Sequence, residues 1–331
     1  MSNFWQDLPK PFFVLAPMAD VTDCAFRQII TKYGKPDVLW TEFVSADGLM
    51  SPGREVLLHD LKYTEQERPI IAQIFTSKPA KMEQASKLIA ELNFDGLDIN
   101  MGCPDRSIEK QGAGAALIRT PQLARELIRS AKKGIALADK NIPVSVKTRL
   151  GYKNNELENW LPELLAEEPA VITIHARTRE EMSKVPARWE EVKRAVEIRN
   201  NLKSSCLIIG NGDLRDLADA REKVEATGAD GAMLGRAIFG NPFLFSKNKF
   251  PEGIEGQELR LRVMLEHTKL FQELLGSPTT GGKSFAIMKK HYKAYVNGWD
   301  GAKELREKLM LTNSAGEVEQ IVGEYLKGGS N

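Results

Sequence analysis

Cysteine is scarce in this sequence. The 331 residues include three, Cys24, Cys103 and Cys206, and none of them forms a Cys-x-x-Cys pair or joins histidines at zinc spacing. So odd and sparse a set excludes a disulfide framework, and no metal site is expected. Cys24 and Cys206 are best interpreted as small buried hydrophobes.

Long hydrophobic runs are also missing. No apolar stretch approaches the roughly 18 residues that span a bilayer. The longest early run, at residues 12–19, is interrupted by Pro17, so we expect neither a signal peptide nor a membrane anchor. We expect the protein to be cytoplasmic. With 42% hydrophobic and 27% charged residues, the chain is neither wholly disordered nor collagen-like.

An excess of charge of one sign is the third absence. Forty-six basic and 45 acidic side chains give a net charge of +1, which argues against a protein that coats nucleic acid indiscriminately. The balance is local, however. Residues 283–308 contain seven basic and three acidic side chains, a net charge of +4, between acidic flanks.

Short apolar segments rich in Val and Ile alternate with helical patterns. Because most of these segments are apolar on both faces, they are typical of buried parallel strands. We expect strands at residues 12–16, 38–41, 70–75, 96–100, 144–148, 171–175, 206–210 and 231–234. Helical patterns fall at 23–33, 79–92, 121–137, 155–166, 188–199 and 214–226.

Eight strands with crossovers of this length predict a (β/α)₈ TIM barrel. A doubly wound open sheet is the alternative, but no Gly-x-Gly-x-x-Gly follows the first strand. After the barrel, helical patterns at 258–275, 284–296, 302–310 and 315–326 predict a C-terminal all-α domain. The predicted domains are therefore residues 1–250 and 251–331.

Function in such a barrel resides at the carboxyl ends of the strands. Glycines after strands 7 and 8 allow backbone amides to approach a phosphate, and Arg236 can bind its oxygens. Tight turns explain the same glycines without a ligand, and many unrelated barrels bind phosphate.

The other strand ends suit a flavin. Lys147 can offset negative charge on the reduced ring, while Gln73 and the backbone at 17–19 can bond its edge and His175 can donate nearby. Each of the three side chains also has a purely structural interpretation. Lys147 can form an ion pair at a strand end, Gln73 can be a polar cap on its strand, and His175 can be a hydrogen-bonded core histidine.

Cys103 follows the fourth strand on a loop between Gly102 and Pro104. No histidine lies within ten residues to form a local thiolate pair. A protonated thiol that donates a proton is consistent with this setting. A structural cysteine remains the alternative from the residues alone.

The strand-end motifs together resemble the tRNA-dihydrouridine synthases. Ala-Pro-Met-Ala-x-Val-Thr-Asp at 16–23, Thr-Glu-Phe-Val-Ser-Ala at 41–46 and Asn-Met-Gly-Cys-Pro at 100–104 occur in the family's order. They are followed by Val-Lys-Thr-Arg at 146–149, His-Ala-Arg-Thr at 175–178 and Gly-Asn-Gly-Asp at 210–213. The ordered set is highly specific. The resemblance covers nearly the whole chain, and it is strongest at residues 16–245 and weaker in the helical segment.

The resemblance implies reduction of the C5–C6 double bond of particular uridines in tRNA, with FMN reduced by NADPH. It makes Cys103 the proton donor to C5 and brings Asn100, Arg149 and Arg177 to the substrate. FMN would be bound by Pro17, Met18, Ala19, Gln73, Lys147, His175, Asn211, Gly212, Asp213, Gly235 and Arg236.

One position departs from the family pattern. Many relatives carry an aromatic residue eight positions after the histidine of the His-x-Arg-Thr motif, and this chain has Ser183 there, beside Met182. The stacking contact expected at that position is therefore in doubt.

In the helical segment, Phe285, Met288, Tyr292 and Val296 share one helical face, which predicts a buried stripe. The basic residues of the same segment track RNA phosphates if the chain binds tRNA, and are otherwise a solvated face. The expected tRNA contacts are Lys289, Lys290, Lys293 and Arg306.

Two other functions compete with the reductase. One is a dihydroorotate-dehydrogenase-like flavoenzyme that acts on a small molecule, and the other is a non-catalytic RNA-binding protein. The motif at 100–104 and the helical domain favour the reductase. No protein partner is implied, and a monomer is expected.

Overall fold

The computed structural model describes residues 3–248, 250–276 and 282–328. They divide into two compact units. The barrel unit comprises the described residues up to Met18 together with Asp37–Arg236, and the helical unit comprises Ala19–Pro36 and the described residues from Ala237 onward. No described helix is both long enough and apolar enough to cross a membrane.

Eight parallel strands form the barrel, and they lie where the sequence predicts them. The strands are β1 (Phe12–Leu15), β2 (Leu39–Ser45), β3 (Ile70–Phe75), β4 (Gly96–Met101), β5 (Val144–Arg149), β6 (Val171–His175), β7 (Leu207–Asn211) and β8 (Gly231–Leu234). Hydrogen-bonded neighbours follow the order β1-β8-β7-β6-β5-β4-β3-β2. At the remaining seam, the Asp37 amide donates to the carbonyl oxygen of Phe13 at 3.0 Å. The predicted (β/α)₈ fold is thus confirmed.

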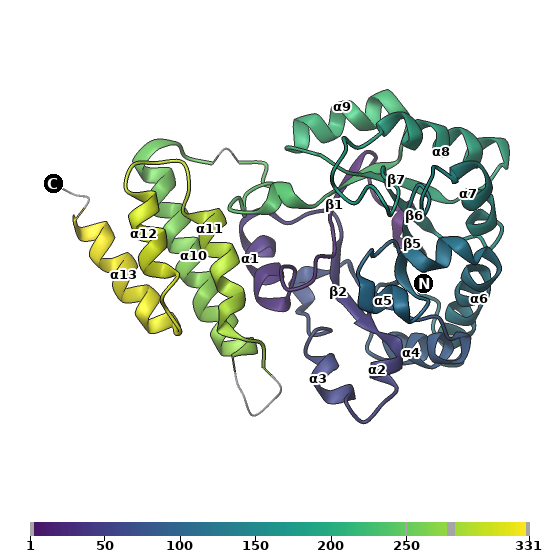
Figure 1. Ribbon diagram of the computed structural model, residues 1–331, viewed down its shortest axis with the longest axis horizontal. Coiled ribbons are helices and arrows are strands. Elements are labelled where there is room, and N and C mark those ends of the chain that lie inside the picture. Colours follow the sequence, from purple (N-terminus) through teal and green to yellow (C-terminus); the bar gives the residue numbers. More distant parts are fainter. Residues whose placement is uncertain (1–2, 249, 277–281, 329–331) are drawn as a thin grey trace. The chain divides into compact units, whose positions relative to one another are not determined.

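Helices surround the strands (Figure 1). They are α4 (Pro79–Glu91), α6 (Pro121–Leu137), α7 (Leu157–Leu165), α8 (Trp189–Asn201) and α9 (Leu217–Thr227). Pro79 and Pro121 occupy the first turns of α4 and α6, where the missing N–H costs nothing. Three short helices, α2 (Ala46–Leu49), α3 (Arg54–Leu58) and α5 (Arg106–Lys110), were not predicted, because segments this short carry little periodicity.

The interior of the barrel contains a cluster of apolar side chains that begins at its amino-terminal end. Phe12, Val14 and Ala16 alternate along β1 and its end, and they join Trp40, Ile71, Val171, Ile209 and Met233 in one buried cluster. Trp5 closes this cluster from a short 3₁₀ turn, Phe4–Gln6, and is wholly buried. This apolar floor leaves the carboxyl ends of the strands for polar side chains.

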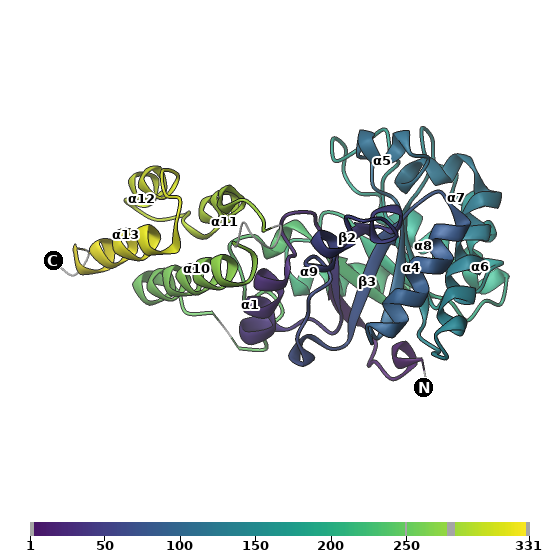
Figure 2. The same ribbon diagram turned by 90° about the horizontal axis from the view of Figure 1, so that it is seen from below.

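The helical unit contains α1 (Cys24–Gly34), α10 (Gly253–Leu275), α11 (Met288–Tyr295), α12 (Ala302–Leu309) and α13 (Ala315–Gly328). Helix α10 packs on α1, α11 and α13, and Figure 2 shows α10 running alongside α13. The predicted stripe contributes buried Met288, Tyr292 and Val296 to its core, and Phe285 packs against them.

The division into units differs from the predicted domains in two respects. The compact barrel unit ends at Arg236 rather than at residue 250, and residues 19–36 group with the helical unit although they follow β1 in sequence. Helix α1 buries Cys24, Ala25 and Ile29 in the same core as α10 and α11. Sequence order assigned this helix to the barrel, but its apolar face belongs to the helical core.

Candidate active site

The strand register brings five of the predicted site residues to one inner face. Ile209, which belongs to the apolar floor, pairs with Thr173, Thr173 with Lys147, and Lys147 with Asn100. One step higher, Asn211 pairs with His175 and His175 with Arg149. Because side chains alternate along a strand and paired residues share a face, these side chains surround the barrel's inner mouth.

A line of hydrogen bonds connects β3, β4 and the Cys103 loop. The Gln73 amide donates from Nε2 to Asp98 Oδ2 at 2.6 Å, and Asn100 Nδ2 donates to Gln73 Oε1 at 3.0 Å. Asn100 Oδ1 then accepts from the backbone N–H of Gly102 at 3.1 Å and of Cys103 at 2.9 Å. Asn100, which the resemblance places at the substrate, therefore also holds the cysteine loop.

The thiol of Cys103 is half-buried beside apolar side chains. It packs with Phe43 against a buried cluster of Phe75, Ile108 and Ala113. Burial raises the pKa of this thiol above its ordinary value, an effect that the nearby charges of Arg149 and Lys147 oppose. The thiol is therefore protonated at neutral pH and is chemically able to act as a proton donor.

Positive charge accumulates at the inner mouth. Burial and the neighbouring Arg149 lower the pKa of Lys147 to about 8, and burial lowers that of Arg149 to about 10. Burial and the same cations hold the pKa of His175 well below its ordinary value, so its ring is neutral. Within the described residues, the Lys147 ammonium donates one hydrogen bond, to Asn211 Oδ1 at 3.4 Å. These crowded cations fit an anionic ligand.

Arg149 spans two loops above the strands. Its Nε donates to the carbonyl oxygen of Gly102 at 2.8 Å, and its Nη1 donates to the carbonyl oxygens of Thr178 at 3.1 Å and Met182 at 3.2 Å. Met182 has a left-handed backbone, with φ of 56°, and a partly exposed side chain. Ser183, where the family pattern predicts an aromatic residue, follows Met182 in the chain.

Asp213, which follows β7, lies at the centre of a second cluster of polar side chains. It pairs with both Arg177 and Arg236, the latter at 2.7 Å, and it accepts the Ala187 amide at 2.8 Å. The hydrogen bond from Arg177 holds the pKa of Asp213 below its ordinary value. Arg177 is buried and also donates to the carbonyl oxygen of Val185 at 2.6 Å. Arg236 is largely exposed, so of the two arginines it is the one open to a ligand.

The glycines of this region have different reasons to be glycine. Gly212 has a φ of 130°, and a Cβ there would lie 2.7 Å from Ala187 Cβ. A Cβ on Gly210 would lie 2.3 Å from the Trp189 ring, whereas one on Gly235 would make ordinary contacts with Ala16 and Met18. Packing requires the first two, and Gly235 alone leaves its backbone approachable.

The remaining predicted residues lie outside these clusters. Pro17 and Met18 follow β1 in the barrel unit, and Ala19 begins the helical unit. On α11, Lys293 is exposed, Lys289 is half-buried and Lys290 lies 3.8 Å from Asp20. Arg306 donates to the carbonyl oxygen of Val296 at 2.7 Å and so caps the end of α11.

Sequence reasoning missed Asp98, the wholly buried carboxylate at the centre of the site. It lies two residues before Asn100 and therefore on the same inner face, a period-two signal that was available. Ser145, which donates to Asp98 Oδ1 at 2.6 Å, was also missed. Within the described part of the chain, no group of three or more His, Cys, Asp or Glu side chains could hold a metal ion.

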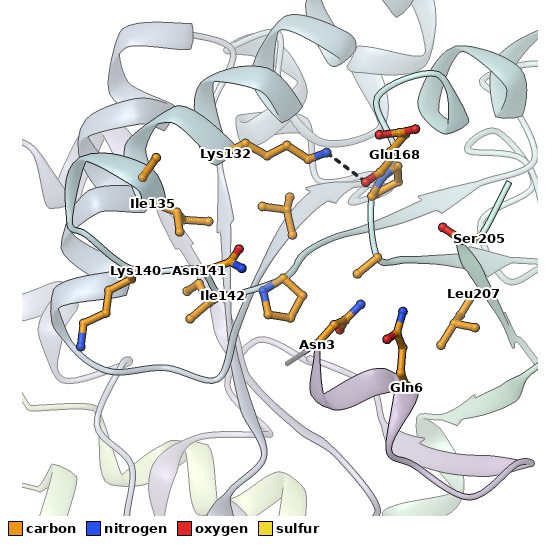
Figure 3. Close-up of a pocket in the computed structure, with 15 residues that line it drawn as sticks. Asn3, Gln6, Lys132, Ile135, Lys140, Asn141, Ile142, Glu168, Ser205 and Leu207 are labelled. Atoms are coloured by element: carbon orange, nitrogen blue, oxygen red, sulfur yellow. Dashed lines mark hydrogen bonds between the residues drawn. The ribbon is translucent and has the colours of Figure 1, made fainter. Parts of the chain in front are cut away.

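A separate cavity of about 480 Å³ lies at the opposite end of the barrel (Figure 3). It is lined by residues that include Asn3, Gln6, Lys132 and Asn141, near the amino-terminal ends of β5, β6 and β7. Its Lys132 ammonium donates to the carbonyl oxygens of Glu167 and Glu168 at 2.6 and 3.0 Å. That cation caps a helix end, and the cavity contains none of the predicted site residues.

Comparison with known proteins decides the family. A model described as dihydrouridine synthase matches residues 14–327. The chain belongs to the dihydrouridine synthase family. It is 41% identical over 325 residues to a protein of Bacillus subtilis named probable tRNA-dihydrouridine synthase 2, with 98% of this chain and 96% of that one covered. A Staphylococcus aureus protein named probable tRNA-dihydrouridine synthase is 39% identical, with 98% and 95% covered.

Solved structures agree on the fold. Histamine dehydrogenase from Rhizobium sp. 4-9 aligns with a TM-score of 0.53 at 14% identity, over 95% of this chain and 62% of that one. The old yellow enzyme from Trypanosoma cruzi aligns with a TM-score of 0.50 at 11% identity, over 70% and 86%. At these identities the likeness shows the fold alone.

Proposed function

We propose that this chain reduces specific uridines in tRNA to dihydrouridine, with FMN as cofactor and NADPH as reductant. The observation that carries the proposal is the protonated, half-buried thiol of Cys103 on a loop that Asn100 ties to the inner mouth of a barrel of this family. The names of the family's relatives supply the substrate class.

The residues of the barrel mouth fit FMN. Lys147 and Arg149 carry positive charge that the described residues there neutralise only in part, which suits the anionic edge of a reduced flavin. Gln73 is the proposed contact to the ring edge, and its buried amide is held by Asp98 and Asn100. Arg236 and the approachable backbone of Gly235 suit the phosphate, and Asp213 holds Arg236 in place.

The reaction adds two hydrogens across one double bond. FMN, when held at the barrel mouth, would supply the hydride for C6 of uracil. The Cys103 thiol gives its proton to C5, and its S–H bond breaks as the C5–H bond forms. Since burial raises the pKa of this thiol, the thiolate readily takes a new proton from water at neutral pH, which restores the acid.

The uracil must leave the RNA stack to reach this position, as in other enzymes that act on bases. Asn100, Arg149 and Arg177 are the proposed substrate residues. Arg149 and Arg177 already bind loop carbonyls, so they shape the pocket wall as well as offering remaining N–H groups. Lys289, Lys290 and Lys293 are proposed to contact tRNA phosphates through the helical unit, in which Arg306 orders α11.

The test is reconstitution. The purified chain with FMN and NADPH is incubated with a tRNA transcript that lacks modifications, and nucleosides are analysed by mass spectrometry. Dihydrouridine that requires both cofactors is expected. A chain that binds FMN and oxidises dihydroorotate but leaves every tRNA unchanged would establish the small-molecule alternative. A chain that binds tRNA but cannot be loaded with FMN would establish the non-catalytic one.

A further inference from the structure

Asp98 dictates the orientation of its neighbour on β3. Its carboxylate is wholly buried and accepts from Gln73 Nε2 on one oxygen and from Ser145 Oγ on the other, each at 2.6 Å. Burial raises its pKa to about 6, so the group is still an anion at neutral pH. An ionised carboxylate only accepts hydrogen bonds. The Gln73 amide must therefore turn its nitrogen toward Asp98.

The other end of the line is fixed by donors. The backbone N–H groups of Gly102 and Cys103 can only donate, so Asn100 must turn its oxygen toward them. The Asn100 nitrogen then faces the oxygen of Gln73, at 3.0 Å. The two side-chain amides therefore share one direction, set independently at both ends.

Reversal of either the Gln73 or the Asn100 amide would break the hydrogen bonds that this shared direction allows. If Gln73 turned over, its oxygen would face the carboxylate of Asp98 and its nitrogen would face the nitrogen of Asn100. Two hydrogen bonds in a buried place would be replaced by two repulsive contacts. The line is thus a directional tie between the carboxylate and the loop that carries the thiol.

We propose that Asp98 is a positioning residue of this active site. Its carboxylate fixes the direction of the Gln73 and Asn100 amides, and through them it fixes the backbone that presents Cys103. The benefit to uridine reduction rests on the proposed function. The positioning of Cys103 is measurable without substrate or turnover.

The experiment measures the alkylation rate of Cys103 by iodoacetamide in the full chain, with modified peptides quantified by mass spectrometry. Cys24 and Cys206 are each 2% exposed, so in the folded protein the reagent reports on Cys103. Asp98→Leu removes the acceptor but keeps a branched side chain of similar size. Release of the loop should expose the thiol and raise the rate by roughly tenfold.

Asp98→Asn is the matched control. Its carboxamide oxygen can accept from Gln73 while its nitrogen faces Ser145 Oγ. The Ser145 hydroxyl can then donate to the Leu97 carbonyl oxygen, which already lies at 3.3 Å. The direction of the Gln73 and Asn100 amides is kept although the charge at position 98 is lost. Cys103 in this variant should therefore be alkylated within about twofold of the parent rate.

Two results would overturn the proposal. One is a folded Asp98→Leu chain that alkylates at the parent rate. The other is an Asp98→Asn chain that alkylates as fast as the leucine variant, because charge and not direction would then govern the loop. If Asp98→Leu does not fold, as judged by its melting transition, Gln73→Met cuts the same line one step nearer the loop, and an unchanged rate there overturns the proposal equally. Absence of dihydrouridine with the parent chain would refute the proposed function and leave these rates interpretable.

Discussion

Arg149 donates from Nε to the carbonyl oxygen of Gly102 at 2.8 Å, immediately before Cys103 in the chain. The same guanidinium binds the loop at Thr178 and Met182. A residue expected at the substrate is thus also the brace between two loops of the barrel mouth. Because the fork of an arginine makes several bonds in fixed geometry, a lysine could not replace it.

Removal of the Cys103 thiol separates the two half-reactions. Cys103→Ala should lower dihydrouridine formation by about 10²- to 10⁴-fold, the usual worth of a positioned acid, while NADPH oxidation by the flavin continues. Single-turnover assays on tRNA, beside stopped-flow measurement of flavin reduction, check this. Cys206→Ala, at a buried cysteine before β7, is the control and should retain activity. Full dihydrouridine formation by Cys103→Ala would remove the proton-donor role.

Lys147 should make flavin affinity depend on pH. Its pKa is lowered to about 8, chiefly by burial, so its positive charge is lost as pH rises through that value. The FMN phosphate, with a second pKa of about 6, is already fully ionised at this pH and contributes no change. Titration of the apoprotein with FMN should therefore show weaker binding at pH 9.5 than at pH 7.

Lys147→Met supplies the comparison for that titration. It should bind FMN weakly at both pH values, because it lacks the titrating charge. An equally steep pH dependence in this variant would assign the effect to another group.

Two glycines should respond to alanine in opposite ways. Gly210→Ala should lower the free energy of unfolding by about 1–3 kcal/mol, since the added Cβ would lie 2.3 Å from the Trp189 ring. Gly235→Ala meets only ordinary contacts, the nearest at 3.7 Å, and should unfold like the parent chain yet bind FMN more weakly. Urea unfolding and FMN titration of both variants test the pair. Normal FMN affinity in Gly235→Ala would place the phosphate elsewhere.

Acidification should loosen the helical unit. Burial lowers the pKa of His291 to about 3 and that of His267 well below its ordinary value, and the two rings meet at 4.7 Å. The unfolded chain binds these protons near pH 6.5, so stability falls as pH drops below that value. The loss is on the order of 1.4 kcal/mol per pH unit for each histidine.

Amide hydrogen exchange in α10 and α11 at pH 7 and pH 5.5 measures this effect, after correction for intrinsic rates. Reading these helices avoids the barrel, where Asp98, with its raised pKa, acts in the opposite sense. His291→Phe should reduce the pH dependence by about half, since it removes one of the two titrating rings. Equal protection at both pH values would show that these rings do not titrate on unfolding.

The basic residues of the helical unit should separate into ligand contacts and structural groups. Lys289→Glu combined with Lys293→Glu should weaken tRNA binding and reduce its salt dependence, without a change in melting temperature. Arg306→Ala should instead lower the melting temperature, because it removes the cap on α11. Filter binding at several salt concentrations measures the first effect. Unchanged affinity of the double variant would exclude both lysines from the interface.

Periodicity predicted the barrel because buried parallel strands and amphipathic helices can be recognised within short windows of sequence. Boundaries of β3, β6, β8 and α6 match the expected ranges residue for residue. Helix α1 was assigned to the barrel, since sequence order cannot show which core receives an apolar face. Asp98 was overlooked although it shares parity with Asn100, because a lone acidic residue within a strand indicates no function until its neighbours are known.

The sequence by itself determined the family, the eight strands and the position of the thiol, since these depend on local pattern and ordered motifs. Tertiary structure decided which polar groups hydrogen-bond to one another. Gln73, Asn100 and Cys103 come from separate segments, and only the register of β3 on β4 shows that one line of hydrogen bonds joins them to Asp98. The reason is physical: a hydrogen bond depends on distance and direction between atoms, and folding alone sets both for residues far apart in the chain.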